Sequence, residues 1–305
     1  DMTLSRRRFL SISAATLAFA HRAQATPLYR WQGSALGARA TITLCHPEAE
    51  RISESARAEI ERLEQIFSLY RATSALSQLN AAGHLAAPPF ELLDCLSLAA
   101  AAHRATAGLF DPSVQPIWDL YARSYSAGNA PAETDIATAR AHGTWADLRY
   151  DTDVIRLRAG MALTLNGIAQ GYIADRIAHL LQAEGLNDIL IDTGELCVLG
   201  GNPQGGDWSV TLDAPDRPQI GLRDRALASS APFGTVFDTE GTAGHILDPR
   251  TGTPATARWQ LISVTAKSAA IADALSTAMC LMSAEEMKTA ESSLSGVKVV
   301  HSAPA

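Results

Sequence analysis

The sequence predicts one α+β domain, in which strands and helices mix without a regular βαβ repeat. Its 305 residues are 47% hydrophobic and 19% charged, an ordinary composition for a globular protein. Strand-like runs alternate with amphipathic runs of helical period, and no internal repeat of about 20 to 50 residues is visible. We therefore expect a single domain over residues 26–305, preceded by a separate leader over residues 1–25.

The leader has the pattern of an export signal. A basic head at residues 6–8 precedes an apolar run over residues 9–20, and Ala23 and Ala25 suit a cleavage site. The run has about half the roughly 20 residues that a membrane-spanning helix needs. The order Ser-Arg-Arg-x-Phe-Leu is typical of a twin-arginine signal. A basic cytoplasmic tail would explain the arginines alone, so we expect export to the periplasm.

Charge and cysteine content narrow the function classes. The formal net charge is −7, and no Lys/Arg cluster follows residue 25, which argues against nucleic-acid binding. The four cysteines (Cys45, Cys95, Cys197 and Cys280) are far apart and form no C-x-x-C pair. An oxidising compartment would allow two disulfides, but the spacing favours buried free thiols and offers no zinc motif.

The first half of the domain predicts a strand and two helices. Residues 29–44 predict a strand with a glycine-containing break at 33–37. Residues 49–70 carry apolar side chains at helical spacing, and residues 88–108 begin with prolines and end with glycine, as helices do. The polar stretch over residues 123–141 predicts an exposed excursion.

The second half predicts mostly strands, with two helices. Strand-like segments are separated by a helix that is entered through glycines, and a second helix follows near the C-terminus. Ile246 and Leu247 predict the end of a buried strand, and Pro249 and Gly252 the turn after it. The other expected elements are a hairpin over 154–165, a helix over 166–185, strands over 188–201, 208–215 and 260–266, a helix over 268–282 and a strand over 297–300.

The segment 268–282 carries a candidate metal site. Asp273 and Thr277 are four residues apart, so their oxygens project from one face of the predicted helix. A carboxylate and a hydroxyl suit a hard cation such as Mg²⁺, which takes few protein ligands. A solvated helix face is the alternative. The apolar residues around Asp273 instead indicate a buried helix, in which a carboxylate needs a partner.

Other motifs are ambiguous when taken singly. Gly167 and Gly171 flank a helix entry where backbone N–H groups can approach an anion, although glycine also suits simple helix packing. Neither the Rossmann nor the P-loop glycine pattern occurs. The Asp-Pro pairs at 111–112 and 248–249 suit structural turns, and His245 is compatible with a core position.

Six motifs occur together in order: SLYRATSALSQLN (68–80), GLFDPSVQPIW (108–118), NGIAQGYIAD (166–175), LIDTGELCVLGG (190–201), HILDPRTGTP (245–254) and ISVTAKSAAIADALSTA (262–278). This set resembles the ApbE family of FAD:protein FMN transferases over nearly the whole domain. The leader and the DTGE and SSAPFGT variants are most similar to the NosX branch, found with nitrous oxide reductase maturation. The resemblance implies an ApbE-like, T-fold-related domain.

The resemblance also implies an activity. Family members cleave FAD and attach its FMN half, through a phosphoester, to a Thr or Ser of a target flavoprotein, and AMP leaves. Such phosphoryl transfer depends on alignment and on neutralised charge, which a magnesium ion supplies. The implied partners are FAD and an acceptor flavoprotein, here of the NosR membrane type. A non-catalytic periplasmic FAD-binding maturation factor and an FAD pyrophosphatase are the alternatives.

Residue roles carry over by position. Asp273 and Thr277 are the implied side-chain ligands of Mg²⁺, with backbone carbonyls from Gly167 and Ser276. His245 is the implied general base, since imidazoles titrate near neutral pH, although it could instead orient the acceptor. The implied FAD contacts are Leu36, Tyr70, Leu109, Phe110, Asp111, Thr164, Gln170 and Leu247.

Three positions depart from the family pattern. Thr164 stands where many members have an aspartate on the adenosine side, Glu195 replaces the usual second glycine of the DTGE motif, and Ala75 replaces a common glutamate. None lies on the face of Asp273 and Thr277. We therefore expect activity to be retained and the affinity for FAD to differ.

Overall fold

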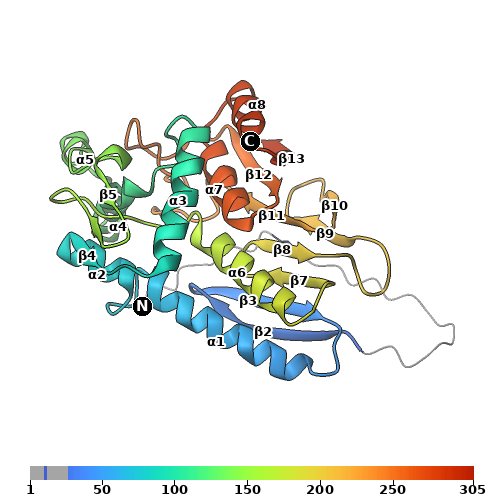
Figure 1. Ribbon diagram of the computed structural model, residues 1–305. Helices are drawn as coiled ribbons and strands as arrows, with labels where there is room; N and C mark the ends of the chain where they lie inside the picture. Colours follow the sequence, from blue (N-terminus) through green and yellow to red (C-terminus); the bar gives the residue numbers. More distant parts are fainter. Residues whose placement is uncertain (1–9, 12–26) are drawn as a thin grey trace.

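The computed structural model describes residues 10–11 and 27–305 and confirms the mixed α+β architecture (Figure 1). Most of the expected export signal lies outside the described residues. The described part of that segment, strand β1 (Leu10–Ser11), pairs with β9 (Trp208–Leu212). Among the described residues, no helix is long and apolar enough to cross a membrane.

A seven-stranded antiparallel sheet forms the centre of the molecule, in the order β13-β12-β11-β8-β7-β3-β2. Its strands are β2 (Tyr29–Ala35), β3 (Ala38–Leu44), β7 (Ile189–Asp192), β8 (Leu196–Leu199), β11 (Arg225–Ser230), β12 (Trp259–Ala266) and β13 (Lys298–Pro304). The break expected in residues 29–44 is the turn of a hairpin, so that segment supplies two paired strands.

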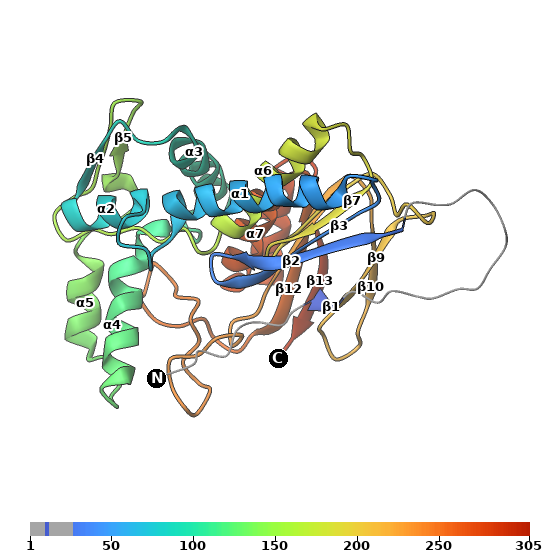
Figure 2. The ribbon, with the colours of Figure 1, turned by 90° about the horizontal axis from the view of Figure 1, so that it is seen from below.

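The two faces of the sheet carry different cover. The helices α1 (Ala49–Phe67), α3 (Phe90–Ala105), α6 (Ala169–Ala183) and α7 (Ala269–Met279) pack on one face (Figures 1 and 2). The hairpin of β9 and β10 (Gln219–Leu222) covers part of the other. Side chains on β7 alternate accordingly: Ile189 and Ile191 join the helical core, and Leu190 joins the cluster under the hairpin. Both faces of the central strands are therefore buried.

Smaller elements complete one end of the molecule (Figure 1). They are α2 (Ala75–Ala82), α4 (Gln115–Ser126), α5 (Glu133–Arg140), the 3₁₀ turns Pro112–Val114 and Trp145–Asp147, and a sheet of β4 (His84–Ala86), β6 (Val154–Arg156) and β5 (Arg149–Tyr150). Helix α8 (Ala284–Ser293) precedes the last strand.

The prediction of a hairpin over residues 154–165 is wrong. Only the first three residues of that segment form a strand. The Asn80 side chain, on α2, takes the place of a second strand, because it bonds both the N–H and the C=O of Leu163 at 2.8 Å. An extended segment can therefore satisfy its backbone without a ladder.

Two further predictions are corrected. The excursion expected over 123–141 is exposed as predicted but largely helical, since α4 continues to Ser126 and α5 occupies Glu133–Arg140. Ile246 and Leu247 are buried but lie outside any strand, with one isolated bridge from Leu247 to Pro254. Neither segment has a periodic apolar pattern strong enough to reveal its structure.

Two of the four cysteines, Cys95 and Cys197, are free thiols, as the spacing predicted. Cys95, Cys197 and Cys280 are buried, while Cys45 is partly exposed. Burial raises the pKa values of the Cys95 and Cys197 thiols, so both stay protonated and act as small core side chains.

Candidate active site

Helix α7 carries the candidate metal residues, and its position is fixed at its N-terminus. Two side-chain caps act there. Ser268 accepts from the N–H of Ile271, and the Asp175 carboxylate accepts from Ser268 Oγ (2.7 Å) and from the N–H groups of Ala269 and Ala270 (2.8 and 3.1 Å). Burial raises the pKa of Asp175, against the lowering effect of these hydrogen bonds. A carboxylate at a helix N-terminus also interacts favourably with the helix dipole.

Asp273 lies where α7 crosses the start of α6. Its side chain is 2% exposed, and Oδ2 accepts from the backbone N–H of Gly171 at 3.2 Å. Gly171 is in the first turn of α6, where backbone N–H groups have no partner within the helix. A methyl group on Gly171 would collide with the backbone of Ala269 and Ala270. Glycine is therefore required for the close helix contact that brings this N–H to the carboxylate.

Thr277 and Gly167 meet one turn further along α7. A methyl group on Gly167 would lie 3.3 Å from Thr277 Oγ1 and 3.3 Å from the Phe110 ring, so the Gly167 backbone lies close to both side chains. The Ser230 hydroxyl, at the end of β11, lies 2.8 Å from Ser276 Oγ and 3.3 Å from Thr277 Oγ1. Four segments that are distant in sequence, those of Phe110, Gly167, Ser230 and Thr277, thus meet around the Ser230 and Thr277 hydroxyls.

This arrangement suits a hard cation. It offers the Asp273 carboxylate on α7 and the Thr277 hydroxyl one turn away. The backbone of Gly167 lies beside that hydroxyl, and glycine leaves room there because it has no side chain. The Ser276 carbonyl lies in the last turn of α7, where carbonyls lack a helical N–H partner, and it accepts only a weak bond from Cys280 Sγ at 3.4 Å. Oxygen donors of this kind are those that Mg²⁺ prefers.

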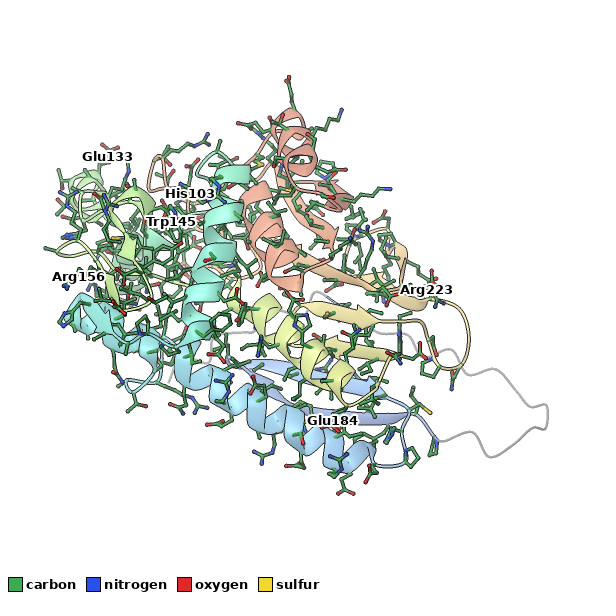
Figure 3. All side chains as sticks on the ribbon, in the orientation of Figure 1. His103, Glu133, Trp145, Arg156, Glu184 and Arg223 are labelled. Atoms are coloured by element: carbon green, nitrogen blue, oxygen red, sulfur yellow. The ribbon has the colours of Figure 1, made fainter. Side chains whose placement is uncertain are left out.

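The segment 109–111 forms a wall of this region. Leu109 and Phe110 are 6% and 5% exposed, and the Phe110 carbonyl bonds the ring of His103, which stacks on Trp145 (Figure 3). Asp111 caps the following 3₁₀ turn by accepting from the N–H and the hydroxyl of Ser113. The structure therefore assigns Asp111 a structural bond.

Thr164 and Gln170 lie on either side of Gly167. The N–H of Thr164 donates to Pro112 at 2.8 Å, and its hydroxyl accepts from Asn166 at 3.2 Å. Gln170 packs its amide against Gly194, which has a φ of +102° and leaves no space there for a side chain. Glu195, the departure from the family pattern, is buried and accepts from the N–H of Ser229 at 3.2 Å.

Leu36 and the segment of Tyr70 both lie beside Glu64 of α1. Leu36 has a φ of +47° in the β2–β3 turn, and its N–H donates to the Glu64 carboxylate at 2.7 Å. Arg71 forms ion pairs with Glu64 and with a neighbouring glutamate of α1. Tyr70 is 78% exposed. The β2–β3 turn and Arg71, the residue after Tyr70, are therefore tied to one buried carboxylate.

His245 belongs to the segment between β11 and β12, residues 231–258. Its ring Nδ1 lies 2.9 Å from the Thr235 carbonyl, which also accepts the backbone N–H of His245 at 3.0 Å. Because a carbonyl only accepts, Nδ1 carries the proton, and in the neutral ring the lone pair is on Nε2. Asp248 accepts from the backbone and guanidinium of Arg250, so this pair holds the turn, as the sequence predicted. Although burial raises the pKa of Asp248, the bonds from Arg250 hold it below its usual value.

The structure groups the predicted residues unevenly. Phe110 and Thr277 both lie close to the Gly167 backbone, and Asp273 is joined to this group through α6 and α7. Leu247, predicted to contact flavin, lies in a separate cluster with Ile117 and Tyr121 of α4. A cavity of about 390 Å³ lies between α4 and α5, and none of the predicted site residues lines it.

Several residues of the site were not predicted. Asp175, Glu64, Ser230 and Phe237 each fix a predicted residue or its segment. Asp175 follows Gly171 by four residues, which places both on one face of α6, and this spacing was the available signal. The other three act through contacts distant in sequence.

Comparison with known proteins decides the family. The model of the ApbE family matches residues 36–301. This chain belongs to the ApbE family. Two curated relatives are both named FAD:protein FMN transferase. The protein from Vibrio cholerae is 28% identical over 256 residues, covering 76% of this chain and 75% of the relative. That from Escherichia coli K12 is 22% identical over 287 residues, covering 88% and 82%.

Solved structures have the same fold. The apo form of the flavinyl transferase ApbE from Pseudomonas stutzeri superposes with a TM-score of 0.78 at 25% identity, covering 87% of this chain and 88% of the other. The ApbE protein from Thermotoga maritima gives 0.80 at 24% identity, covering 90% and 94%. The ApbE-like fold predicted from the motifs is thereby confirmed.

Proposed function

We propose that this protein is an FAD:protein FMN transferase. An acceptor Thr or Ser hydroxyl attacks the phosphorus of the FMN half of FAD, the pyrophosphate P–O bond breaks, and AMP leaves. The observation that carries the proposal is the contact of α6 with α7, which joins Asp273, Thr277 and Gly167 within an ApbE-family chain. The names of the curated relatives support it.

Magnesium dependence is part of the proposal. Asp273 and Thr277 would hold Mg²⁺ with their side chains, and Gly167 and Ser276 with their carbonyls. Bound there, the ion would neutralise charge on the pyrophosphate. The buried setting of Asp273 supports this role, because a metal would satisfy a carboxylate that solvent hardly reaches.

His245 is the proposed general base. Its Nδ1 is held by the Thr235 carbonyl, so Nε2 would accept the proton of the attacking hydroxyl. The ring is partly exposed between the buried residues Gly244 and Ile246, as suits a group that must meet a second protein. Leu36, Tyr70, Leu109, Phe110, Asp111, Thr164, Gln170 and Leu247 remain the proposed FAD contacts.

Mass spectrometry of an acceptor tests the function. A flavoprotein domain with a candidate Thr is incubated with this protein, FAD and Mg²⁺, and an acceptor with that Thr changed to Ala serves as the control. We expect the mass of an FMN phosphoester on the first acceptor only, with one AMP released per transfer. Bound FAD without AMP would indicate a binding protein. AMP with free FMN would indicate a pyrophosphatase.

Location, branch and acceptor are further proposals. We propose that the protein is exported to the periplasm through the twin-arginine route and modifies a NosR-type membrane flavoprotein, as in the NosX branch. The sequence pattern of residues 5–25 and the DTGE and SSAPFGT variants support this. Replacing Arg6 and Arg7 by Lys should leave the precursor in the cytoplasm, and normal periplasmic accumulation would contradict the route.

A further inference from the structure

The segment 231–258 carries His245 without forming a helix or a strand. Local backbone bonds give it a short hairpin, in which the N–H of Phe237 donates to Ala243 (2.8 Å) and the N–H of His245 to Thr235 (3.0 Å). These bonds fix the shape of the hairpin. They do not fix how the hairpin sits on the rest of the molecule, so its side-chain contacts must do that.

Phe237 makes such contacts with α4. Its ring lies 5.2 Å from that of Trp118, edge-on, 5.5 Å from Tyr121 and 6.4 Å from Tyr125, nearly parallel to the last. Aromatic pairs at these separations contribute about 0.5–1.5 kcal/mol each beyond the area that they bury. Three rings of one helix therefore hold one ring of the hairpin.

The aromatic contacts of Phe237 are close in the chain to the groups that hold the His245 imidazole. Phe237 is two residues from Thr235, whose carbonyl binds both His245 N and Nδ1. Its partner Ala243 is two residues before His245. A shift of the Phe237 ring would therefore move the neighbouring Thr235 and Ala243. Through the Thr235 carbonyl it would reach both the backbone N–H and the Nδ1 atom of His245.

A second contact lies beyond His245. Gly252, with a φ of +75°, packs so closely on α5 that a methyl group would lie 2.7 Å from side-chain atoms of Ile136 and Arg140. The Arg140 guanidinium also donates to the Arg250 carbonyl. Helices α4 and α5 thus hold the hairpin on both sides of His245, and Figure 2 shows the segment beside them.

We propose that Phe237 is a positioning residue that fixes the His245 imidazole for phosphoryl transfer, by anchoring residues 231–258 to α4. The proposal rests on the proposed function, in which His245 accepts the acceptor's proton. Phe237 belongs to a cluster that is separate from the main core, and its partners there include Tyr121 and Leu247. Truncating it should therefore leave the core and the α6–α7 contact intact.

A double-mutant cycle tests the proposal in the full-length protein. Phe237→Ala should lower the single-turnover transfer rate about tenfold to a hundredfold, as a small displacement of a catalytic group does, while FAD affinity stays unchanged. Phe237→Tyr, which keeps the ring, should stay near the wild-type rate. In a His245→Ala background, Phe237→Ala should have no further effect, because the group that it positions is gone.

Matched controls separate positioning from stability. Ile220→Ala removes a partly buried side chain from the cluster under β9 and β10, and should lower the melting temperature without lowering the rate. Added imidazole should raise the rates of His245→Ala and of the double variant equally, which makes slow rates measurable. Equal losses from Phe237→Ala in both backgrounds, or an unchanged rate in the single variant, would overturn the positioning role. A wild-type rate for His245→Ala would instead overturn the base role on which it rests.

Discussion

The two halves of the candidate site are held in place by different means. Asp273 lies on a helix whose N-terminus is capped by the buried Asp175 and whose side packs on the backbone of α6. His245 lies on an irregular segment that side chains of α4 and α5 hold. The first half is built from backbone contacts inside the main core. The second is held by side chains: rings of α4, one guanidinium of α5, and the buried Ile246 and Ala255 of the segment itself.

This difference indicates how each half responds to change. Backbone contacts between helices cannot adjust without moving whole elements, because interiors are close-packed. A segment held by side chains can shift locally at modest cost. We expect mutations near Asp273 to affect stability and activity together, and mutations around His245 to affect chiefly the rate of transfer.

Asp273 should give the largest effect. Asp273→Asn keeps an oxygen for the Gly171 N–H but removes the charge, so transfer should fall about a thousandfold, since a bound metal supplies several kcal/mol of transition-state stabilisation. Asp273→Ala should be equally inactive and also less stable. AMP release across a Mg²⁺ titration, with melting temperatures, provides the measurement. A fully active Asp273→Asn at saturating Mg²⁺ would rule out the metal role.

His245→Ala should come next, at about a hundredfold, which is within the range that general bases contribute. FAD affinity and melting temperature should stay near wild type, because His245 is partly exposed and its bonds are made within its own hairpin. The pH–rate profile should lose its ascending limb, because no imidazole is left to accept the proton of the attacking hydroxyl. If His245 only orients the acceptor, the variant will bind acceptor poorly and keep the wild-type pH dependence.

The sequence predicted the first half of the site better than the second. Helices α6 and α7 have strong apolar periodicity and glycine punctuation, so Asp273 and Thr277 were placed on the right helix. Gly167 was placed at the entry to α6, which begins at Ala169 rather than at residue 166 as predicted. The segment 231–258 has no period, and Ile246 and Leu247 were wrongly assigned to a strand because two buried apolar residues resemble one. Its partner helix α5 was predicted only as part of an exposed excursion, without its helical structure.

The remaining omissions have a common cause. Asn80 replaces a strand for Leu163, Glu64 holds Leu36, and Phe237 meets α4, each across a long sequence separation. Local propensity carries no information about such contacts. The roles of individual residues came from the family resemblance, and the structure supplies the contacts that fix them.

Two glycines give the next, smaller effect and compare the halves directly. Gly171→Ala would place a methyl group 2.7 Å from the backbone nitrogen of Ala270 and nearer still to Ala269, so α6 and α7 must separate. We expect a loss of about 2–3 kcal/mol in the free energy of unfolding, with transfer reduced as well.

Gly252→Ala is the matched change in the irregular segment. Its methyl group would meet only side-chain atoms of Ile136 and Arg140, which can move, and the positive φ adds strain of about 1–2 kcal/mol. Urea unfolding and transfer rates on both variants make the comparison. If Gly252→Ala proves the more destabilising, the contrast between the two halves is wrong.

Leu36 should give the smallest effect, because two contributions to stability oppose each other there. At a φ of +47° a leucine is strained by about 1–2 kcal/mol, and Leu36→Gly relieves this but loses packing and gains unfolded-chain entropy. The free energy of unfolding should change by less than about 1 kcal/mol.

FAD affinity should fall about fivefold to tenfold, the equivalent of one lost apolar contact of about 1 kcal/mol, if Leu36 meets the flavin. Ala87→Gly is the control, since Ala87 has the same φ but is exposed on a distant loop; it should leave FAD affinity unchanged. Isothermal titration with FAD measures the affinities of the wild type and of both variants. Equal affinities for wild type and Leu36→Gly would remove Leu36 from the cofactor site. A strained leucine would then serve only the β2–β3 turn, where glycine or asparagine would do as well.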